Sequence, residues 1–292
     1  STTFEMDPVQ KRLHDLCRNI VAAELRSGGN RKLQAEIIRL QRIMVFAIMI
    51  ASNPTIISND RFHQVVTLAE PDIAEQLIEA KKTIEDYGPK FRYACRRARD
   101  LASQGKKVLI WSSFTDNVGL LAEELQDLGA VYIRGDVPTE EGKDDPYKDF
   151  RDVSEEEEET REKRIKKFKT DDSCMVMIAN PAAAGEGISL HDVCHHAIYV
   201  DRIFNATHFM QSMDRIHRYG KDKVTGEIIC QKHTTTIEIL CCKDSIDTMV
   251  HSNLARKMKA MYEWLNDSDL NPQLSALDPF FTDEELEMFV NQ

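Results

Sequence analysis

Short apolar runs separated by helical segments constrain this fold more than any other feature of the sequence. Each run is three to five residues long and lacks the polar alternation of a half-exposed strand. Parallel strands that are covered by helices on both faces have this composition. We therefore predict an α/β fold with a doubly wound parallel sheet, in which ligands bind at the carboxyl ends of the strands. The predicted strands are residues 108–111, 131–133, 174–178, 197–200 and 227–230.

Helical patterns surround these runs and extend the chain at both ends. Asp7 followed by Pro8 is a helix start, and Gly28-Gly29 interrupts the pattern before a second helix that ends at Asn53-Pro54. Added N-terminal and C-terminal helices are therefore expected around the α/β core. Their approximate ranges are residues 8–27, 33–52, 71–86, 89–103, 116–128, 244–265 and 283–289.

Length and composition fit one large or two small globular domains. The chain has 292 residues, of which 42% are hydrophobic and 30% charged. Its longest apolar run, residues 43–51, is too short to span a membrane, and the N-terminus lacks the apolar segment of a signal peptide. The seven cysteines have no regular spacing, which favours a reduced intracellular protein over a disulfide framework. We therefore expect a cytoplasmic protein without a membrane partner.

The negative charge is concentrated in one stretch. Residues 136–159 hold twelve acidic and three basic residues, so they contribute −9 of the net charge of −11. We interpret residues 136–154 as an acidic insertion and expect Glu155–Glu159 to open the helix that follows. Docking of a basic protein partner is an alternative use of this stretch. Without it the surface could approach DNA phosphates through a basic cluster of Lys90, Arg92, Arg96, Arg97, Arg99, Lys106 and Lys107.

The segment from Gln211 to Gly220 carries the most specific pattern. Arg215 and Arg218 are three residues apart, and on a helix this spacing puts both guanidinium groups on one face. Gln211 and Asp214 lie within one turn and can hold the two arginines in place. A planar, permanently charged pair of this kind suits a developing phosphoryl charge. The competing interpretation is a surface helix with ordinary charge pairs.

A glycine-containing turn follows the predicted strand at residues 174–178. Gly185 and Gly187 flank Glu186, and glycines there allow the backbone to approach a phosphate closely. The next residues include His191, Asp192, Cys194, His195 and His196, but no second pair of ligands is evident elsewhere. A structural zinc site usually needs two separated pairs, so we expect no metal site here.

These two segments resemble motifs V and VI of superfamily 2 helicases, in the form carried by SNF2-type DNA translocases. The resemblance rests on residues 183–190 and on residues 201–220, in the order of the family. It implies a RecA-like, P-loop NTPase-like second helicase lobe. Residues 195–201 favour a bacterial member. Two departures are Ala184, where the family has glycine, and Ser189, where it has asparagine.

The resemblance also implies residue roles. Arg215 and Arg218 would be arginine fingers, and Gly185, Glu186, Gly187, Gln211 and Asp214 would face the nucleotide. Residues 107–115 look like motif IV, and Tyr132 to Asp136 resemble the motif after it. The residues implied to contact DNA are Ser112, Ser113, Phe114, Thr115, Arg134, Ala183 and Ala184. Residues 40–54 look like the helix before the lobe, and Thr236 to Glu238 look like the start of a bracing helix.

The phosphate-binding half of such a motor is not found in this sequence. No Gly-x4-Gly-Lys-Ser/Thr loop occurs, and Asp283-Glu284-Glu285 lies in the tail rather than at a strand end. We therefore expect ATP and Mg²⁺ to be held mainly by an N-terminal RecA-like lobe, with this chain an excised piece or one subunit of a split motor. The predicted divisions are residues 1–87 (helical extension), 88–240 (lobe) and 241–292 (bracing helices).

The sequence therefore predicts the second lobe of an ATP-dependent double-stranded DNA translocase, inactive without its first lobe. Two alternatives stay open. One is the lobe of an RNA-directed superfamily 2 helicase, and the other is a catalytically dead RecA-like interaction module that uses the acidic stretch to hold a basic partner.

Overall fold

The computed structural model describes residues 1–27, 34–139, 159–184, 188–217, 220–221, 228–229, 233–266 and 281–292. The predicted acidic insertion lies outside the described residues from position 140 onward, and so do Gly185, Glu186, Gly187 and Arg218. The chain divides into two compact units. Unit 1 contains residues 1–93, 200–206 and 239–292, and unit 2 contains residues 94–199 and 207–238.

Unit 2 is built on the predicted parallel sheet. Strands β2 (Val108–Trp111), β3 (Val131–Ile133), β4 (Val176–Ala179) and β5 (His196–Tyr199) lie in the order β5-β2-β4-β3, and every pairing among them is parallel. β2 and β4 are buried along their whole length, as their unbroken apolar runs predict. Strand β8 (Thr236–Cys242) continues the sheet beyond β5, where the Thr236 amide donates to the His195 carbonyl oxygen at 2.8 Å. The predicted α/β fold is confirmed.

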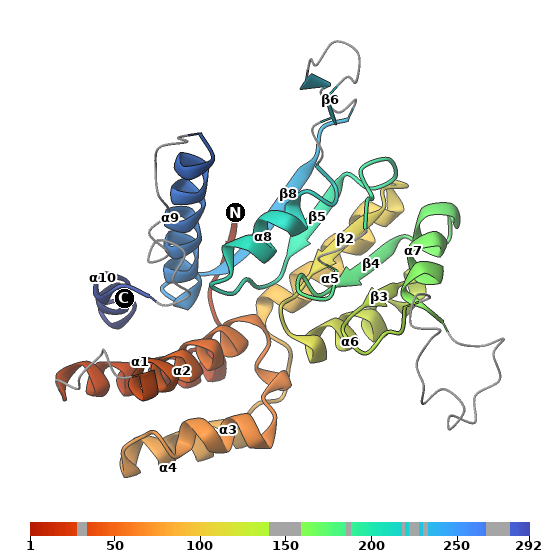
Figure 1. The fold of residues 1–292 in the computed structure, drawn as a ribbon. Coiled ribbons are helices and arrows are strands. Elements are labelled where there is room, and N and C mark those ends of the chain that lie inside the picture. The colour runs from red at the N-terminus through yellow and green to blue at the C-terminus, as the bar shows by residue number, and fades with distance from the viewer. Residues whose placement is uncertain are drawn as a thin grey trace, which may run out of the picture. The chain divides into compact units, whose positions relative to one another are not determined.

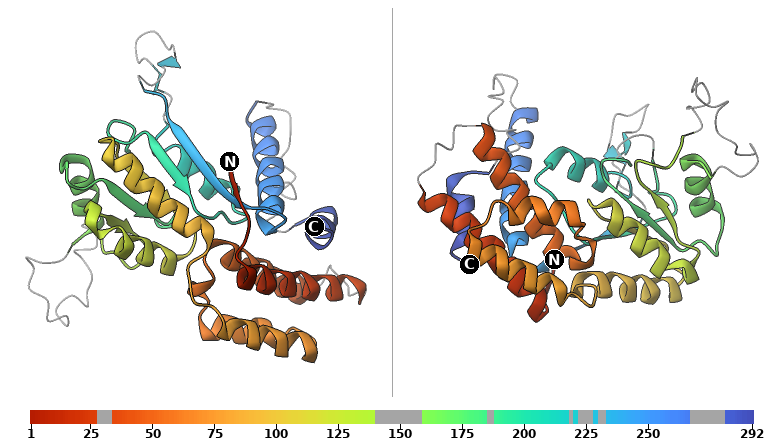
Figure 2. Two further views of the ribbon diagram at one scale, coloured as in Figure 1. Left: turned by 180° about the vertical axis from the view of Figure 1, so that it is seen from behind. Right: turned by 90° about the horizontal axis from the view of Figure 1, so that it is seen from below.

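Helices cover both faces of this sheet. Helix α5 (Pro89–Ser103), which begins in unit 1, lies on the face seen in the left view of Figure 2, and α8 (Ala206–Met213) lies on the opposite face, in front in Figure 1. Helix α6 (Thr115–Glu124), the short 3-10 helix η2 (Gln126–Leu128) and α7 (Arg161–Thr170) complete the unit. Helix α6 packs on β3 and β4, and α7 packs on β3.

Unit 1 is mainly helical. It contains α1 (Pro8–Arg26), α2 (Gln34–Ser52), the 3-10 helix η1 (Pro54–Ile56), α3 (Asn59–Val66), α4 (Pro71–Lys82), α9 (Ile246–Asn266) and α10 (Asp283–Val290). Helix α1 packs on α2, α4 and α10, and α2 packs on α9. The short strand β1 (Thr2–Phe4) pairs in parallel with the end of β8. The largest buried side chains of these helices include Leu13, Ile20, Ile43, Met44, Phe46 and Ile48.

Helix boundaries follow local capping chemistry. The Asp7 amide donates to the Gln10 side chain at 3.3 Å at the start of α1, and Pro8 occupies the first turn, as predicted. Helix α7 begins at Arg161, and its N-cap is Thr160, whose hydroxyl accepts from the Lys163 amide. The prediction that the glutamates open this helix is wrong for Glu159, because it precedes the cap.

Two further predictions of secondary structure need correction, and two elements were not predicted. Residues 236–238 start strand β8 rather than a helix, since β-branched side chains there favour a strand. The run at residues 227–230 supplies only β7 (Ile228–Ile229), which pairs with β6 (Gly220–Lys221) in an antiparallel ribbon apart from the main sheet. Helix α3 and strand β1 were not predicted. Both are short, with eight and three residues.

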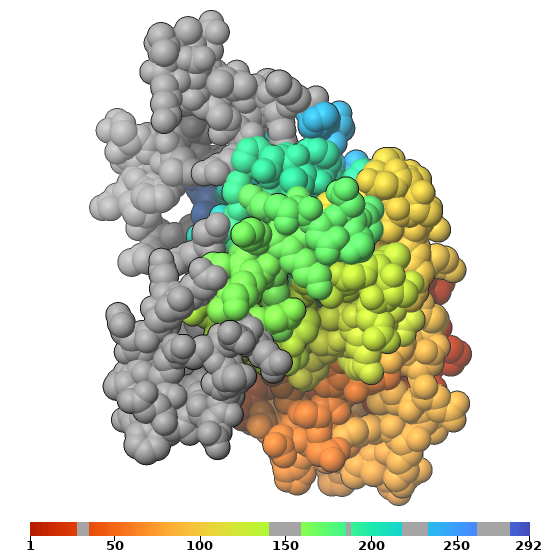
Figure 3. All heavy atoms as spheres, turned by 90° about the vertical axis from the view of Figure 1, so that its right-hand side faces the viewer, coloured from red at the N-terminus to blue at the C-terminus, as the bar shows by residue number. Residues whose placement is uncertain are grey.

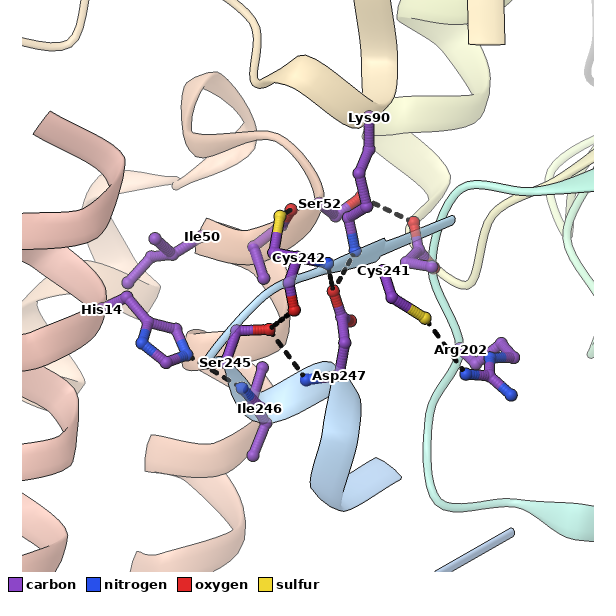
Figure 4. Close-up of polar contacts among 12 residues, drawn as sticks. His14, Ile50, Ser52, Lys90, Arg202, Cys241, Cys242, Ser245, Ile246 and Asp247 are labelled. Carbon is purple, nitrogen blue, oxygen red and sulfur yellow. Dashed lines mark hydrogen bonds and ion pairs between the residues drawn. The ribbon is translucent and has the colours of Figure 1, made fainter. Parts of the chain in front are cut away.

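A buried polar cluster holds the interior of unit 1 together. Figure 4 shows the Lys90 ammonium directed at the Asp247 carboxylate, 2.7 Å away, with both side chains at most 5% exposed. The same carboxylate oxygen accepts from the Cys242 amide at 2.7 Å. Burial by itself would lower the pKa of Lys90, but the Asp247 carboxylate outweighs it and leaves this pKa raised. The pair therefore joins the first turn of α5 to the first turn of α9.

Two further contacts of this cluster connect other segments of unit 1. The Ile246 amide donates to Nε2 of the fully buried His14 at 3.0 Å, and the Ser52 hydroxyl donates to Asp201 at 2.8 Å (Figure 4). Burial and the nearby charge of Arg18 lower the pKa of His14 to about 3. His14 is therefore neutral at physiological pH, as its role as an acceptor requires.

None of the described helices combines the length and apolar composition needed to cross a lipid bilayer. The six cysteines in the described part of the chain are free thiols.

Candidate functional site

The turn after β2 is stabilised by buried side chains. The Ser112 hydroxyl is fully buried and accepts from the Phe114 amide and from the Asn117 side chain, both at 3.3 Å. Phe114 is the N-cap of α6 and is also buried. Ser113 is partly exposed, and Thr115 is exposed at the first position of α6. Of the four residues predicted to contact DNA here, Ser112 and Phe114 therefore shape the turn, and Ser113 and Thr115 remain accessible.

Asn180, which the sequence analysis did not select, connects three loops at the carboxyl edge of the sheet. It directly follows β4, and its backbone amide donates to the Ile133 carbonyl oxygen at the end of β3 at 2.9 Å. Its side-chain amide donates to the Ser113 carbonyl oxygen at 2.9 Å, and its side-chain oxygen accepts from the Ala182 amide at 2.9 Å. A polar residue directly after an apolar strand and before a proline was the signal that could have identified it.

The turn after β4 begins tightly folded on this asparagine. The amides of Ala183 and Ala184 both donate to the Asn180 carbonyl oxygen, at 3.1 and 2.9 Å. The Ala184 side chain is buried and that of Ala183 is partly exposed. Any contact of Ala184 with a ligand would therefore be made by its backbone. The next three residues, Gly185 to Gly187, lie outside the described residues.

The structure brings Arg215 next to the end of this same turn. One guanidinium nitrogen of Arg215 donates to the Ile188 carbonyl oxygen at 3.1 Å. The Leu190 amide in turn donates to the Arg215 carbonyl oxygen at 2.8 Å. Two predicted motifs that are about thirty residues apart in sequence are thus joined by both side-chain and backbone hydrogen bonds.

The prediction that Arg215 lies on a helix needs correction. Helix α8 ends at Met213, and Arg215 lies in the turn that follows, where its amide donates to the Ser212 carbonyl oxygen at 3.3 Å. This i→i+3 bond shows that the helix tightens before it ends. The Ser212 hydroxyl, buried against Tyr199 at 2.7 Å, fixes α8 on β5. Gln211 and Asp214 are exposed on either side of it.

Arg134 is engaged with an acidic neighbour. Its Nε donates to Asp136 at 2.7 Å, and this hydrogen bond holds the pKa of Asp136 below its usual value. The guanidinium carbon lies 5.1 Å from the centroid of the Tyr132 ring. Arg134 is therefore ordered beside β3, but a phosphate would have to replace a carboxylate to reach it.

The predicted basic cluster is not an open basic face. Lys90 is buried in unit 1, Arg97 pairs with Glu238 at 2.7 Å, and Arg99 pairs with Asp127 at 3.2 Å. The Lys107 ammonium donates to three backbone carbonyl oxygens at the end of α7, those of Phe168, Asp171 and Cys174, at 2.6 to 3.0 Å. Spacing along the sequence suggested a shared basic surface, but most of these charges are paired with carboxylates or hydrogen-bonded to the backbone.

The histidine-rich segment after the glycine turn is not arranged as a metal site. Among the described residues, no group of three or more His, Cys, Asp or Glu side chains is placed to hold an ion. Burial raises the pKa of Cys194 to about 12, so its thiol is not poised as a thiolate ligand. The His195 ring lies 4.6 Å from that of His233, and the Ser189 hydroxyl is 2.8 Å from Nδ1 of His191.

The carboxyl edge of the sheet thus gathers exposed polar groups and one arginine on a rigid support. Turns after β2 and β4 are joined by Asn180, and the second of them ends beside Arg215. Such an arrangement can bind an anion with the side chains of Ser113 and Thr115 and the guanidinium group of Arg215, in the place where doubly wound sheets bind ligands.

Residues 90–220 match the family model described as the helicase conserved C-terminal domain. The chromatin-remodeling ATPase INO80 of Mus musculus is 26% identical over 191 residues, which are 64% of this chain and 10% of that protein. The Homo sapiens INO80 protein matches over the same lengths at the same identity. The match thus spans only about a tenth of these curated relatives.

Two solved structures share the fold over 99% of this chain. The C-terminal part of the Fun30 ATPase domain has a TM-score of 0.57 and 20% identity, with 93% of that chain covered. The Sulfolobus solfataricus SWI2/SNF2 ATPase core in complex with double-stranded DNA has a TM-score of 0.55 and 16% identity, with 49% of that chain covered. The predicted bacterial character stays a prediction. This chain is thus similar to the helicase conserved C-terminal domain over residues 90–220 and to INO80 over 191 residues, and it shares its fold with the Fun30 and SWI2/SNF2 ATPase structures.

Proposed function

We propose that this chain is the C-terminal motor lobe of an ATP-dependent double-stranded DNA translocase. In this proposal Arg215 and Arg218 are arginine fingers that meet the phosphates of ATP held by an N-terminal RecA-like lobe. Gly185, Glu186, Gly187, Gln211 and Asp214 line the nucleotide side. Ser113, Thr115, Ala183 and Arg134 meet the DNA backbone, while Ser112, Phe114 and Ala184 shape the turns that carry them.

The observation that carries the proposal is the hydrogen bond from Arg215 to the Ile188 carbonyl oxygen. It holds a permanently charged guanidinium group beside the segment that follows the glycine turn. Arginine suits this role because its planar group can donate two parallel hydrogen bonds to phosphate oxygens. Asn180 supports the proposal further, because it couples the turn proposed for DNA to the turn proposed for nucleotide.

In this proposal the N-terminal lobe makes most of the contacts to ATP and Mg²⁺, and this chain makes few. The charge of Arg215 fits a phosphate, whereas the described residues offer no set of carboxylates for Mg²⁺. The first lobe would therefore hold the ion, which neutralises phosphate charge when bound. The residues of this chain would orient and stabilise the transferring phosphoryl group, and the chain alone would not hydrolyse ATP.

The test is the DNA-stimulated ATPase of the full-length protein. We expect Arg215→Ala to lower kcat by about 10³-fold or more, since an arginine finger contributes 10³ to 10⁵. Arg215→Lys keeps the charge but loses the planar group, and should recover only a small part of the rate. Arg99→Ala removes an exposed arginine paired with Asp127 and is the matched control. Near-normal turnover by Arg215→Ala would remove the role assigned to it.

The nucleic acid is tested in the same assay. Duplex DNA should stimulate hydrolysis by the full-length protein more strongly than duplex or single-stranded RNA of the same length. Stronger stimulation by RNA would favour the lobe of an RNA-directed helicase instead. Absence of hydrolysis with every nucleic acid, together with binding of a basic protein through the acidic stretch, would favour the interaction module.

A further inference from the structure

Helix α7 carries an unusual concentration of positive charge on its exposed side. Its ten residues contain six basic side chains and one acidic side chain. Lys163, Lys166 and Lys167 are exposed, and their i, i+3, i+4 spacing puts them on one face of the helix. The opposite face is fixed by Phe168, which is fully buried. Figure 3 shows α7 (green) on the surface of unit 2.

Only part of this charge favours the helix. Lysines one turn apart repel each other, and Arg161 and Lys163 lie in the first turn, where the helix dipole disfavours cations. Lys167 and Lys169 lie in the last turn, where the same dipole favours them. The Thr160 cap and the contacts of Lys107 also stabilise the helix, so Lys163 and Lys166 carry charge that helix formation does not require.

Arg164 of α7 and the neighbouring Arg134 are held in positions where they can bind an anion. The guanidinium carbons of Arg164 and Arg134 lie 4.1 and 5.1 Å from the centroid of the Tyr132 ring. Arg164 also donates to the Tyr132 carbonyl oxygen at 3.0 Å. Stacking and hydrogen bonding fix these groups in advance, so less conformational entropy is lost when they bind a ligand.

The two arginines hold the first and last acidic residues of the acidic stretch. Arg134 pairs with Asp136 at 2.7 Å, and Arg164 pairs with Glu159 at 3.2 Å. The arginine side chains are 28% and 13% exposed, whereas both carboxylate side chains are 60% exposed. Ion pairs with such exposed carboxylates contribute little, so a competing anion can replace them.

We propose that Tyr132, Arg134, Arg164 and the lysine face of α7 form a second nucleic-acid surface, which binds backbone phosphates. Asp136 and Glu159 occupy its arginines until phosphates displace them. A repeating phosphate backbone matches lysines at one-turn intervals, and protein interfaces are instead depleted of lysine and enriched in apolar side chains. The surface shares Arg134 with the DNA contacts of the proposed function and extends them to Arg164 and the lysine face of α7, and it rests on the proposed function in taking nucleic acid as the ligand.

The test measures binding of a fluorescently labelled 20-base-pair DNA duplex to this chain without ATP, across a range of salt concentrations. The triple variant Lys163→Gln, Lys166→Gln, Lys167→Gln should bind about 10-fold or more weakly at 0.1 M salt. The slope of log K against log salt should also become shallower by up to about 2.7, since each neutralised phosphate contributes about 0.9. Lys11→Gln, Lys82→Gln, Lys243→Gln removes the same charge from exposed positions elsewhere and is the control.

Neutralising Asp136 and Glu159 should strengthen DNA binding, whereas neutralising the lysines should weaken it. Asp136→Asn with Glu159→Gln should raise the affinity for the duplex about threefold or more, because it releases both arginines. Glu75→Gln with Glu85→Gln makes the same change in net charge at exposed positions of unit 1 and should have a smaller effect. Circular dichroism checks that each variant is folded.

Three outcomes would contradict the proposal that this surface binds nucleic acid. The first is an equal salt slope for the lysine triple and its control. The second is unchanged or weaker binding after the two carboxylates are neutralised. The third is tighter binding of poly-L-glutamate than of the duplex at the same salt, which would assign the surface to acidic polypeptides. None of these measurements depends on ATP hydrolysis, so failure here is distinguishable from failure of the arginine-finger proposal.

Discussion

Helices α5 and α7 are both rich in basic residues, but the two helices use their charges in opposite ways. Along α5, Lys90 is buried against Asp247, Arg92 pairs with Asp7 and Asp86, and Arg97 and Arg99 pair with acidic residues of their neighbours. Along α7, three lysines on one face are exposed. A run of basic residues in sequence therefore does not define a basic surface, because the surroundings of each side chain decide whether its charge is available.

The difference has a physical origin in what each helix packs against. The first turn of α5 packs in the interior of unit 1, where a charge is tolerated only with a partner. Helix α7 packs on β3, the terminal strand of the sheet, and the lysines on its outer face are exposed in the part of the chain that the structure describes. Position in the architecture thus separates the buried structural charges of α5 from the exposed charges that we propose bind phosphates.

The largest expected effect is at Lys90. Lys90→Met leaves the Asp247 carboxylate buried without its partner and should lower the free energy of unfolding by about 3 to 5 kcal/mol. The same substitution on α7, Lys167→Met, should change it by less than about 0.5 kcal/mol. Urea denaturation followed by circular dichroism measures both. Similar losses of unfolding free energy for the two variants would contradict the difference between α5 and α7.

His14 should give the next largest effect, through pH. Because burial lowers the folded-state pKa of His14 to about 3 from 6.5, the unfolded chain binds a proton between these values that the folded chain does not. Stability should therefore fall as the pH decreases through this window, by about 1.4 kcal/mol per pH unit from this group. Between pH 6.5 and 4.5 this amounts to about 2 to 3 kcal/mol.

His14→Gln removes this titration and can still accept from the Ile246 amide. Its free energy of unfolding should depend on pH less steeply than that of the parent chain. His63→Gln replaces an exposed histidine and is the control, which should follow the parent curve. Parallel curves for all three proteins would show that His14 is not held neutral by burial.

A smaller effect is expected at Lys107. Lys107→Met keeps an aliphatic side chain but loses the ammonium group, which lies 5.2 Å from the centroid of the Phe168 ring and donates to three carbonyl oxygens in and after the last turn of α7. Charge-assisted bonds of this kind contribute about 1.5 to 3 kcal/mol, so we expect a loss of about 2 kcal/mol in urea denaturation. The neighbouring Lys106 is exposed, and Lys106→Met should be nearly neutral. Equal effects would mean that Lys107 does not anchor the helix.

The strands of the sheet could be predicted because they are buried on both faces. Such a strand is a short apolar run whichever strands it pairs with. Helix starts were similarly readable where a cap and a proline coincide, as at Asp7 and Pro8. Strand β8 could not be predicted in the same way, because its neighbours β5 and β1 lie some forty and more than two hundred residues away in sequence. Local pattern carries no information about such pairing.

The sequence named the residues of the candidate site but not their geometry. The hydrogen bond from Arg215 to the Ile188 carbonyl oxygen was not predicted, and the roles assigned to these residues stay predictions. The end of α8 at Met213 was not predicted, since helix boundaries depend on packing as well as on local residues. The role of Asn180 depends on three loops that come together only in the folded sheet.

The interleaving of the two units has a consequence for synthesis on the ribosome. The polypeptide passes between them after residues 93, 199, 206 and 238, so unit 1 is complete only when the last residues have emerged. Helices α1 to α4 are made before unit 2, whereas their packing partners α9 and α10 are made after it. Unit 2, whose final residue is 238, can therefore close before unit 1 does. Until then, the surfaces of α1 and α2 that pack on α10 and α9 stay uncovered.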